Sequence, residues 1–276
     1  MRAALLQICS SDDPAANLGM VREMVQEAAQ GGASFILTPE VTNCVSTSRR
    51  HQSAVLRHEE DDPMLADLRQ QAAALGVWVL IGSLGLKTHD EDGRFANRSF
   101  LISPDGSICA RYDKLHMFDV DIGKGDSFRE SDGYRPGDAA VLAKTDFAKI
   151  GMTICYDLRF AQLYRALAKA GAQILTVPAA FHPVTGAAHW ETLLRARAIE
   201  TGCFVMAPAQ TGEHNISQGT PRKSFGQSMV ISPWGKIIAR ANDAPGIVFV
   251  DLDLDEVAQA RERVPSLVHD RQFKAP

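Results

Sequence analysis

The sequence lacks any apolar run long enough to cross a membrane. Apolar stretches such as Val77–Leu80 and Met229–Ile231 fall far short of the roughly 20 residues that a spanning helix needs. The N-terminal segment Met1–Gln7 has only a short apolar part, and no small-residue cleavage site follows it. We interpret this segment as a buried strand and expect a cytoplasmic protein that does not bind membranes.

An excess of positive charge is also absent. The chain has 29 Lys and Arg residues against 33 Asp and Glu, which gives a net charge of −4 and a pI near 6.1. Proteins that bind nucleic acid typically present a basic face to the phosphate backbone. We therefore expect no nucleic-acid partner.

Cysteine is sparse and shows no pairing pattern. The five cysteines lie far apart and form no C-x-x-C motif: Cys9, Cys44, Cys109, Cys155 and Cys203. An odd number in a large domain does not indicate a disulfide framework, and the histidines and cysteines show no zinc-ligand spacing. Walker A, G-x-G-x-x-G, H-E-x-x-H and G-x-S-x-G motifs are missing as well. We expect neither a metal nor another cofactor.

Strand-like and helix-like segments alternate along the chain, and no linker divides it. We therefore expect one α/β domain over residues 1–276, with mixed sheets and helices on their outer faces. The predicted strands cover residues 3–8, 34–38, 77–82, 149–155, 173–177, 204–207 and 246–251, and the predicted helices cover 14–30, 64–75, 159–170, 187–201 and 254–263. Two hairpins are predicted at 94–112 and 226–241, and an irregular stretch at 116–138. The acidic run 58–62 is interpreted as a solvated loop.

Three charged or nucleophilic residues follow predicted strands, where the functional groups of α/β proteins gather. Glu40 ends the run Phe35–Glu40, and Lys114 follows the first hairpin. Cys155 ends the run Ile150–Cys155, where a helix is predicted to begin. A helix N-terminus favours the thiolate form of cysteine, and the next N–H, from Tyr156, is placed to stabilise an oxyanion.

Three motifs together resemble the nitrilase (carbon–nitrogen hydrolase) superfamily: Leu37-Thr38-Pro39-Glu40, Tyr112-Asp113-Lys114-Leu115-His116 and Gly151–Phe160. The resemblance implies a four-layer α-β-β-α sandwich that dimerises through its helices, with a higher homo-oligomer as the alternative. It also implies Cys155 as nucleophile, Glu40 as general base, Lys114 as oxyanion partner, and a thioester intermediate that water hydrolyses. Glu130 matches the position of a second glutamate that positions lysine and substrate.

Within the superfamily, segments such as Thr185–Glu191 and Ala209–Gly212 are similar to the Nit branch of small-molecule amidases. This resemblance implies a small carboxylated amide as the substrate, with ammonia as the leaving group. Deaminated glutathione is the first candidate, and 2-oxoglutaramate is the alternative. Nitriles and N-carbamoyl amines are further alternatives, because related enzymes use the same three residues.

A substrate carboxylate calls for a cationic partner, and Arg129 and Arg159 lie beside the motif residues, although Arg159 is also placed to pair with Asp157. Of Arg195 and Arg197, two apart on a predicted helix, only one can face the sheet. Two departures from relatives affect specificity: Gln227, where relatives often carry His, and the 215–224 loop.

A non-enzymatic interpretation remains open from the sequence alone. A reactive Cys155 would suit a redox sensor or interaction protein, with Cys203 as its resolving partner in a reversible disulfide.

Overall fold

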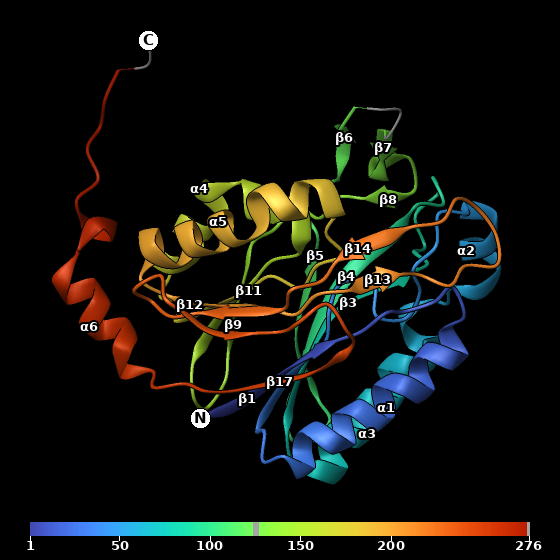
Figure 1. The fold of residues 1–276 in the computed structure, drawn as a ribbon, viewed down its shortest axis with the longest axis horizontal. Coiled ribbons are helices and arrows are strands. Elements are labelled where there is room, and N and C mark those ends of the chain that lie inside the picture. Colours follow the sequence, from blue (N-terminus) through green and yellow to red (C-terminus); the bar gives the residue numbers. More distant parts are fainter. Residues whose placement is uncertain (124–126, 275–276) are drawn as a thin grey trace.

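The computed structural model describes residues 1–123 and 127–274. Two sheets lie face to face, and a pair of long helices covers the outer face of each (Figure 1). None of the helices in these residues combines the length and the apolar character that a bilayer-crossing segment needs.

The first sheet is built mainly by the N-terminal half of the chain. Its strand order is β17 (Gly246–Asp251), β1 (Arg2–Gln7), β2 (Phe35–Leu37), β3 (Trp78–Leu86), β4 (Phe95–Ile102) and β5 (Ile108–Asp113), and β8 (Tyr134–Arg135) pairs with β4. Strands β1, β2 and β3 are parallel, whereas β17, β4 and β5 pair antiparallel to their neighbours.

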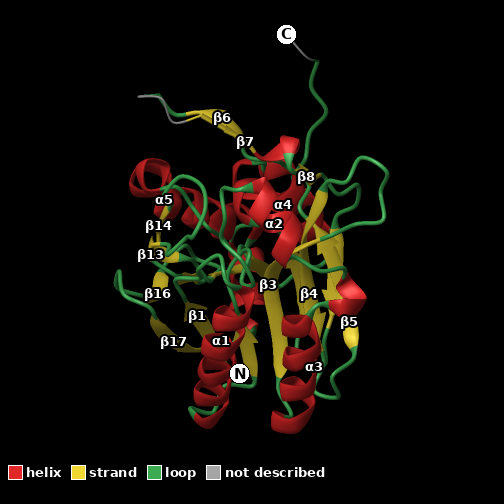
Figure 2. Ribbon diagram, turned by 90° about the vertical axis from the view of Figure 1, so that its right-hand side faces the viewer, coloured by secondary structure: helices red, strands yellow, loops and turns green. Residues whose placement is uncertain are grey.

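Helices α1 (Pro14–Gln30) and α3 (Pro63–Leu75) lie side by side against this sheet (Figure 2). Both begin with the same signal, an aspartate followed by proline. The Asp13 and Asp62 side chains accept backbone N–H groups of the first turn, which satisfies donors that have no partner within the helix.

The second sheet comes from the C-terminal half. Its strand order is β16 (Ile237–Arg240), β15 (Met229–Ile231), β12 (Phe204–Ala207), β11 (Ile174–Thr176), β10 (Lys149–Met152) and β9 (Val141–Lys144). Helices α4 (Ala161–Lys169) and α5 (Pro183–Thr201) cover its outer face (Figure 1). Helix α6 (Asp255–Arg263) follows β17, and the chain directly after it contacts α4 and α5.

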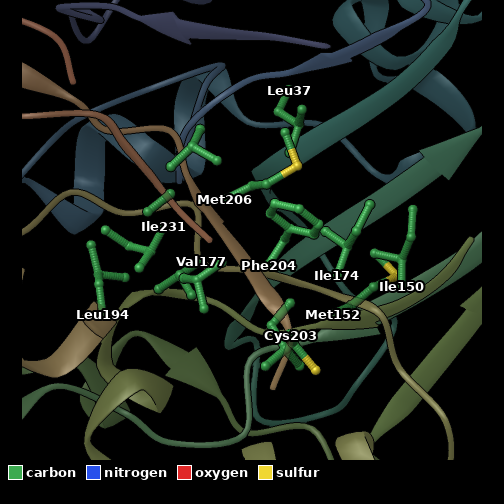
Figure 3. Close-up of a cluster of buried hydrophobic side chains, with 14 of the residues drawn as sticks. Leu37, Ile150, Met152, Ile174, Val177, Leu194, Cys203, Phe204, Met206 and Ile231 are labelled. Atoms are coloured by element: carbon green, nitrogen blue, oxygen red, sulfur yellow. The ribbon is translucent and has the colours of Figure 1, made fainter. Parts of the chain in front are cut away.

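The main core lies between the two sheets. Leu37 of β2 shares one cluster with Met152, Ile174, Phe204 and Met206 of the second sheet (Figure 3). A second cluster joins the first sheet to α1 and α3. The predicted α-β-β-α sandwich is therefore confirmed. The single-domain prediction stays a prediction, supported by this shared core.

Most predicted elements are present, and the differences have local causes. Helix α5 begins four residues before the predicted start, because the His182 side chain accepts the Val184 N–H and Pro183 occupies the first turn. The strand predicted to end at Cys155 ends at Met152, since residues 155–159 form the short 3-10 helix η3 (Cys155–Arg159).

Several short elements were not predicted: α2 (Arg49–Val55), the ribbon β6 (Asp119–Asp121) with β7 (Ser127–Arg129), the ribbon β13 (Thr211–Glu213) with β14 (Lys223–Phe225), and the 3-10 helices η1 (Glu59–Asp61), η2 (Glu130–Asp132) and η4 (Ser266–Val268). The predicted irregular stretch 116–138 contains three of them and β8, and its residues 124–126 lie outside the described residues.

The interpretation of residues 58–62 as a solvated loop was wrong in part: Glu60 and Asp61 are exposed, but Glu59 and Asp62 make structural contacts. Glu59 accepts hydrogen bonds from Arg98 at 2.7 Å and Arg111 at 2.7 Å. Asp62 is buried and caps α3. The acidic run therefore anchors the start of α3 to the first sheet.

A buried carboxylate fastens the two sheets to each other. Asp157, in η3 after β10, is fully buried and accepts the Tyr112 hydroxyl of β5 at 2.6 Å. It also accepts the ring and backbone N–H of His116, at 2.7 and 3.1 Å, and the Ile154 N–H at 2.9 Å. The turn that carries Cys155 is thus fixed to the far edge of the first sheet.

We predict that Tyr112→Phe destabilises the protein more than Tyr164→Phe. Both hydroxyls are buried, but that of Tyr112 donates to a carboxylate, whereas that of Tyr164 pairs with the neutral Thr153 hydroxyl at 2.7 Å. Hydrogen bonds to charged groups contribute about 1.5–3 kcal/mol and neutral ones about 0.5–1.5 kcal/mol. Urea unfolding of both variants measures the difference, and equal losses would show that the carboxylate has no special role.

Candidate active site

The four predicted catalytic residues lie together at one end of the two sheets. Glu40 follows β2, Lys114 follows β5, Cys155 opens η3 and Glu130 opens η2. All four line one cavity of about 800 Å³, a size typical of small-molecule sites, which span about 300–1,000 Å³. Glu40, Lys114 and Cys155 are nearly inaccessible, with exposed fractions of 4%, 2% and 6%.

Lys114 is held between two carboxylates. Its Nζ lies 2.8 Å from Glu40 Oε1 and 2.8 Å from Glu130 Oε2. Glu40 also accepts the Ala180 N–H at 2.8 Å, and Glu130 accepts the Phe118 N–H at 2.7 Å. Backbone donors from two loops therefore fix both carboxylates around the ammonium group.

The backbone at the site is strained at two positions. Cys155 has φ of +48° and Val41, directly after Glu40, has φ of +47°. Positive φ is uncommon outside glycine and costs most for a β-branched residue such as valine. The Cys155 N–H donates to the Pro178 carbonyl at 2.9 Å, which holds the turn. One strained residue is the predicted nucleophile, and the other directly follows the predicted base Glu40.

A glycine permits the approach of the strand ends. A Cβ at Gly82 of β3 would lie 2.0 Å from the Thr38 carbonyl oxygen and 2.5 Å from that of Pro39. Only glycine fits here without moving the segment that carries Glu40.

Burial and neighbouring charges shift the pKa values of Glu40 and Lys114 in opposite directions. Burial alone would raise the pKa of the Glu40 carboxyl, but the charge of Lys114 and hydrogen bonds from Lys114 and Cys155 hold it below its ordinary value. Burial alone would lower the pKa of Lys114, but Glu130 and Glu40 hold it well above its ordinary value. At neutral pH the Glu40 carboxylate and the Lys114 ammonium are therefore both charged.

Cys155 rests as a neutral thiol. Burial and the adjacent Glu40 carboxylate raise the pKa of its thiol well above the ordinary value, and Lys114 opposes them only in part. The prediction that a helix N-terminus favours the thiolate was wrong, because η3 is a short 3-10 helix and a carboxylate lies beside the sulfur. The Glu40 carboxylate, which shares a hydrogen bond with the thiol, is the nearest acceptor for its proton.

The predicted substrate-binding residues occupy different positions. Tyr156 and Arg129 line the cavity, and Arg159 does not. The Arg159 guanidinium lies over the rings of Tyr156 and Phe181, 5.6 and 5.5 Å from their centroids. These two rings line the cavity, so Arg159 contacts two residues of its wall.

The contacts also show where three arginines and Gln227 lie. The predicted pairing of Arg159 with Asp157 was wrong, because other donors occupy that carboxylate. Arg197 is buried and Arg195 is half exposed, as the helical spacing predicted. Gln227 lies outside the cavity lining, and its side chain bonds to Asp243.

Sequence reasoning missed two residues of the site. Asn97 of β4 donates to Glu40 Oε1 at 2.9 Å and to Glu130 Oε1 at 3.3 Å. Arg222, within the 215–224 loop, lines the cavity and donates to the Ala180 carbonyl at 3.1 Å. The Asn97 carbonyl oxygen accepts the Lys114 N–H across the hairpin. A polar residue at this position opposite Lys114 was the sequence signal that could have identified Asn97.

The predicted disulfide between Cys155 and Cys203 does not fit the sheet. Cys203 precedes Phe204, which is level with Ile174 and Ile150 across β12, β11 and β10. Cys155 lies five residues beyond Ile150, roughly 15 Å along the strand direction, whereas bridged cysteines have Cα atoms less than about 7 Å apart. Cys203 therefore cannot serve as the resolving cysteine that the redox-sensor interpretation needs.

One group of possible metal ligands exists within the described residues, away from the cavity. His58, Glu60 and His89 approach one another at the surface. The two imidazole rings are stacked, with centroids 4.3 Å apart and planes 4° from parallel. In that arrangement the nitrogen lone pairs run side by side and do not converge on one point, so the group supports no metal site.

The sequence matches the carbon–nitrogen hydrolase family over residues 2–262. A deaminated glutathione amidase from Yersinia enterocolitica is 39% identical over 269 residues, which cover 97% of this chain and 92% of that protein. The C. elegans NitFhit structure aligns with a TM-score of 0.89 and 34% identity, over 98% of this chain and 65% of that longer chain.

An amidase mutant from Nesterenkonia sp. AN1, solved after Michael addition of acrylamide at its active-site cysteine, aligns with a TM-score of 0.77 and 25% identity. The match covers 96% of this chain and 98% of that one. The chain therefore belongs to the carbon–nitrogen hydrolase family and is a hydrolase of carbon–nitrogen bonds other than peptide bonds.

Proposed function

We propose that this hydrolase cleaves the amide bond of deaminated glutathione, with Cys155 as the nucleophile. The observation that carries the proposal is the buried thiol beside a carboxylate and an ammonium group in one cavity. A cavity of about 800 Å³ accommodates a substrate of this size. The curated relative at 39% identity acts on the same compound by its name.

In the first half of the reaction, Glu40 takes the thiol proton as Cys155 attacks the amide carbon. The Lys114 ammonium and the Tyr156 N–H stabilise the oxyanion; as a first-turn N–H of η3, the latter has no acceptor within its helix. Glu40 then gives its proton to the leaving nitrogen, and a thioester on Cys155 remains. The neutral resting thiol makes this proton transfer part of the attack.

In the second half, Glu40 deprotonates water, which attacks the thioester carbon; the C–S bond then breaks, the acid leaves, and Glu40 returns the proton to the Cys155 sulfur. Glu130 positions Lys114 and does not exchange protons in this scheme. Deaminated glutathione joins 2-oxoglutarate to cysteinylglycine, so its leaving group is the amine of that dipeptide, and the expectation of ammonia was wrong for this substrate. Ammonia is the leaving group for the alternative substrate, 2-oxoglutaramate.

The predicted substrate contacts form part of the proposal. Arg129 and Tyr156 line the cavity, and both are assigned to the substrate. Arg159 lies over the Tyr156 and Phe181 rings and is not among the residues that line the cavity. It is assigned to the acyl end of the substrate.

The assembly and location are proposed on separate grounds. Val184 and Ile199 of α5 are 61% and 56% exposed, and Trp234 is 57% exposed. These apolar side chains, with the family resemblance, support a homodimer through the α5 face, which light scattering tests as a mass of twice 30.0 kDa. Five free cysteines suit a reducing compartment, so we propose a cytoplasmic location.

The substrate proposal is tested by 2-oxoglutarate formation from deaminated glutathione and from 2-oxoglutaramate. Both compounds yield this product, so their kcat/KM values compare directly, and we expect deaminated glutathione to be preferred. Cys155→Ala abolishes turnover, and Cys109→Ala, which removes an exposed thiol on β5, leaves it unchanged. A preference for 2-oxoglutaramate would reassign the substrate, and turnover by Cys155→Ala would refute the mechanism.

We further predict that Glu40→Gln lowers both activity and the pKa of the Cys155 thiol. Loss of the general base reduces kcat by about 10²–10⁴-fold. The Glu40 carboxylate helps to raise the thiol pKa, so its removal shifts thiolate formation to lower pH. Ultraviolet absorbance of the thiolate against pH measures the shift, with Cys155→Ala subtracted as the background.

Glu130→Gln is the matched control for this titration. It removes the other carboxylate on Lys114, which does not act on the thiol directly, and should shift the titration less. A thiol that titrates at higher pH in Glu40→Gln than in the wild type would contradict the assigned charge states.

A further inference from the structure

One cationic side chain in the cavity wall has most of its hydrogen-bonding capacity unused. Arg222 directly precedes β14, is half-buried and lines the cavity. A guanidinium carries five N–H donors, and one of them reaches the Ala180 carbonyl oxygen at 3.1 Å. Within residues 1–123 and 127–274, no carboxylate forms an ion pair with it.

The other cations of the lining are already engaged. Lys114 is held by two carboxylates, and Lys223 pairs with Glu213 at 2.8 Å. Arg49 and Arg129 each donate to two backbone carbonyl groups. Arg222 therefore has the largest unused donor set among the lining cations that the structure describes.

The backbone of Arg222 is fixed. Its carbonyl oxygen accepts the His214 N–H at 2.9 Å, and the ribbon of β13 and β14 continues from this bond. The His214 ring lies 2.7 Å from both the Ser10 carbonyl oxygen and the Ser224 hydroxyl. Burial lowers the pKa of His214 to about 4, so this ring is neutral at physiological pH and the anchor carries no charge of its own.

Arg222 is also close to the reacting groups. It bonds to the carbonyl of Ala180, and the N–H of the same residue holds Glu40 Oε2 at 2.8 Å. The lining carboxylates of Glu40, Glu130 and Asp132 repel an anionic substrate. The unpaired Arg222 guanidinium beside them attracts the anionic group of a substrate whose amide lies next to Glu40.

We propose that Arg222 binds a carboxylate of the substrate and so makes the cavity select anionic amides over uncharged ones. The planar guanidinium offers two parallel N–H groups to one carboxylate, a geometry that lysine does not reproduce. This inference rests on the proposed amide hydrolysis and adds a residue that determines its specificity.

The test compares deaminated glutathione with its dimethyl ester, which has the same scissile amide and no carboxylate. Neither compound has a primary amine, so amine release follows the cleavage of both. For Arg222→Gln we expect KM for the diacid to rise about tenfold to a hundredfold, the range for a lost hydrogen bond to a charged group. Turnover of the ester should change little, and Arg222→Lys should lie between wild type and Arg222→Gln.

Lys223→Gln is the matched control. It removes one positive charge from the adjacent position, whose ammonium pairs with Glu213, and it should affect both compounds alike. Equal losses for diacid and ester in Arg222→Gln would overturn the proposal, because they would show that Arg222 acts through Glu40 or the loop. An unchanged KM for the diacid would overturn it as well.

A binding measurement separates this inference from the proposed chemistry. Calorimetry gives the Kd of 2-oxoglutarate for Cys155→Ala and for Cys155→Ala with Arg222→Gln, and needs no turnover. We expect weaker binding in the double variant, and equal affinities would contradict the role of Arg222. Absence of amide hydrolysis by the wild type would instead refute the proposed function.

Discussion

The rest of the site depends on a buried ammonium group between two carboxylates. A charge taken out of water is costly unless it is paired and hydrogen-bonded, and Lys114 meets both conditions through Glu40 and Glu130. The carboxylates in turn need donors, which Asn97, the Ala180 N–H and the Phe118 N–H supply. Two sheets and three loops must therefore converge on one point for the group to exist.

This arrangement of charges determines the protonation of Cys155 and Glu40. Burial and the Glu40 carboxylate raise the pKa of the Cys155 thiol, so the sulfur rests as a neutral thiol, and Lys114 keeps Glu40 ionised. The strained turn at Cys155 is held through Asp157, which Tyr112, His116 and Ile154 saturate with hydrogen bonds. The carboxylates of the cavity lining disfavour an anionic substrate, and the guanidinium of Arg222 compensates for this.

The sequence indicated the layers and the positions of the four motif residues because these depend on local patterns. The Asp-Pro starts of α1 and α3 and the alternation of strands and helices are visible along the chain. Glu40, Lys114, Cys155 and Glu130 were found through ordered motifs, and the first three lie at strand ends of the two facing sheets. Their catalytic roles remain a proposal.

What the sequence did not indicate depends on contacts between distant segments. Asn97 is one polar residue in an otherwise ordinary hairpin strand, and Arg222 lies in a loop that reaches the cavity only through the β13–β14 ribbon. The thiol pKa was misjudged because the nearest charge, Glu40, is 115 positions away in the chain. Cys203 was paired with Cys155 although the strand register places them at opposite ends of the sheet.

The most direct measurement of the central claim is the rate at which Cys155 becomes acylated in Lys114→Met. Rapid quenching followed by mass spectrometry of the Cys155 peptide reports the 2-oxoglutaryl thioester before it is hydrolysed. The account predicts that the thioester forms on Cys155 in the wild type and forms about 10²–10³-fold more slowly without the ammonium group. Acylation of Lys114→Met at the wild-type rate, or acylation at a residue other than Cys155, would contradict it.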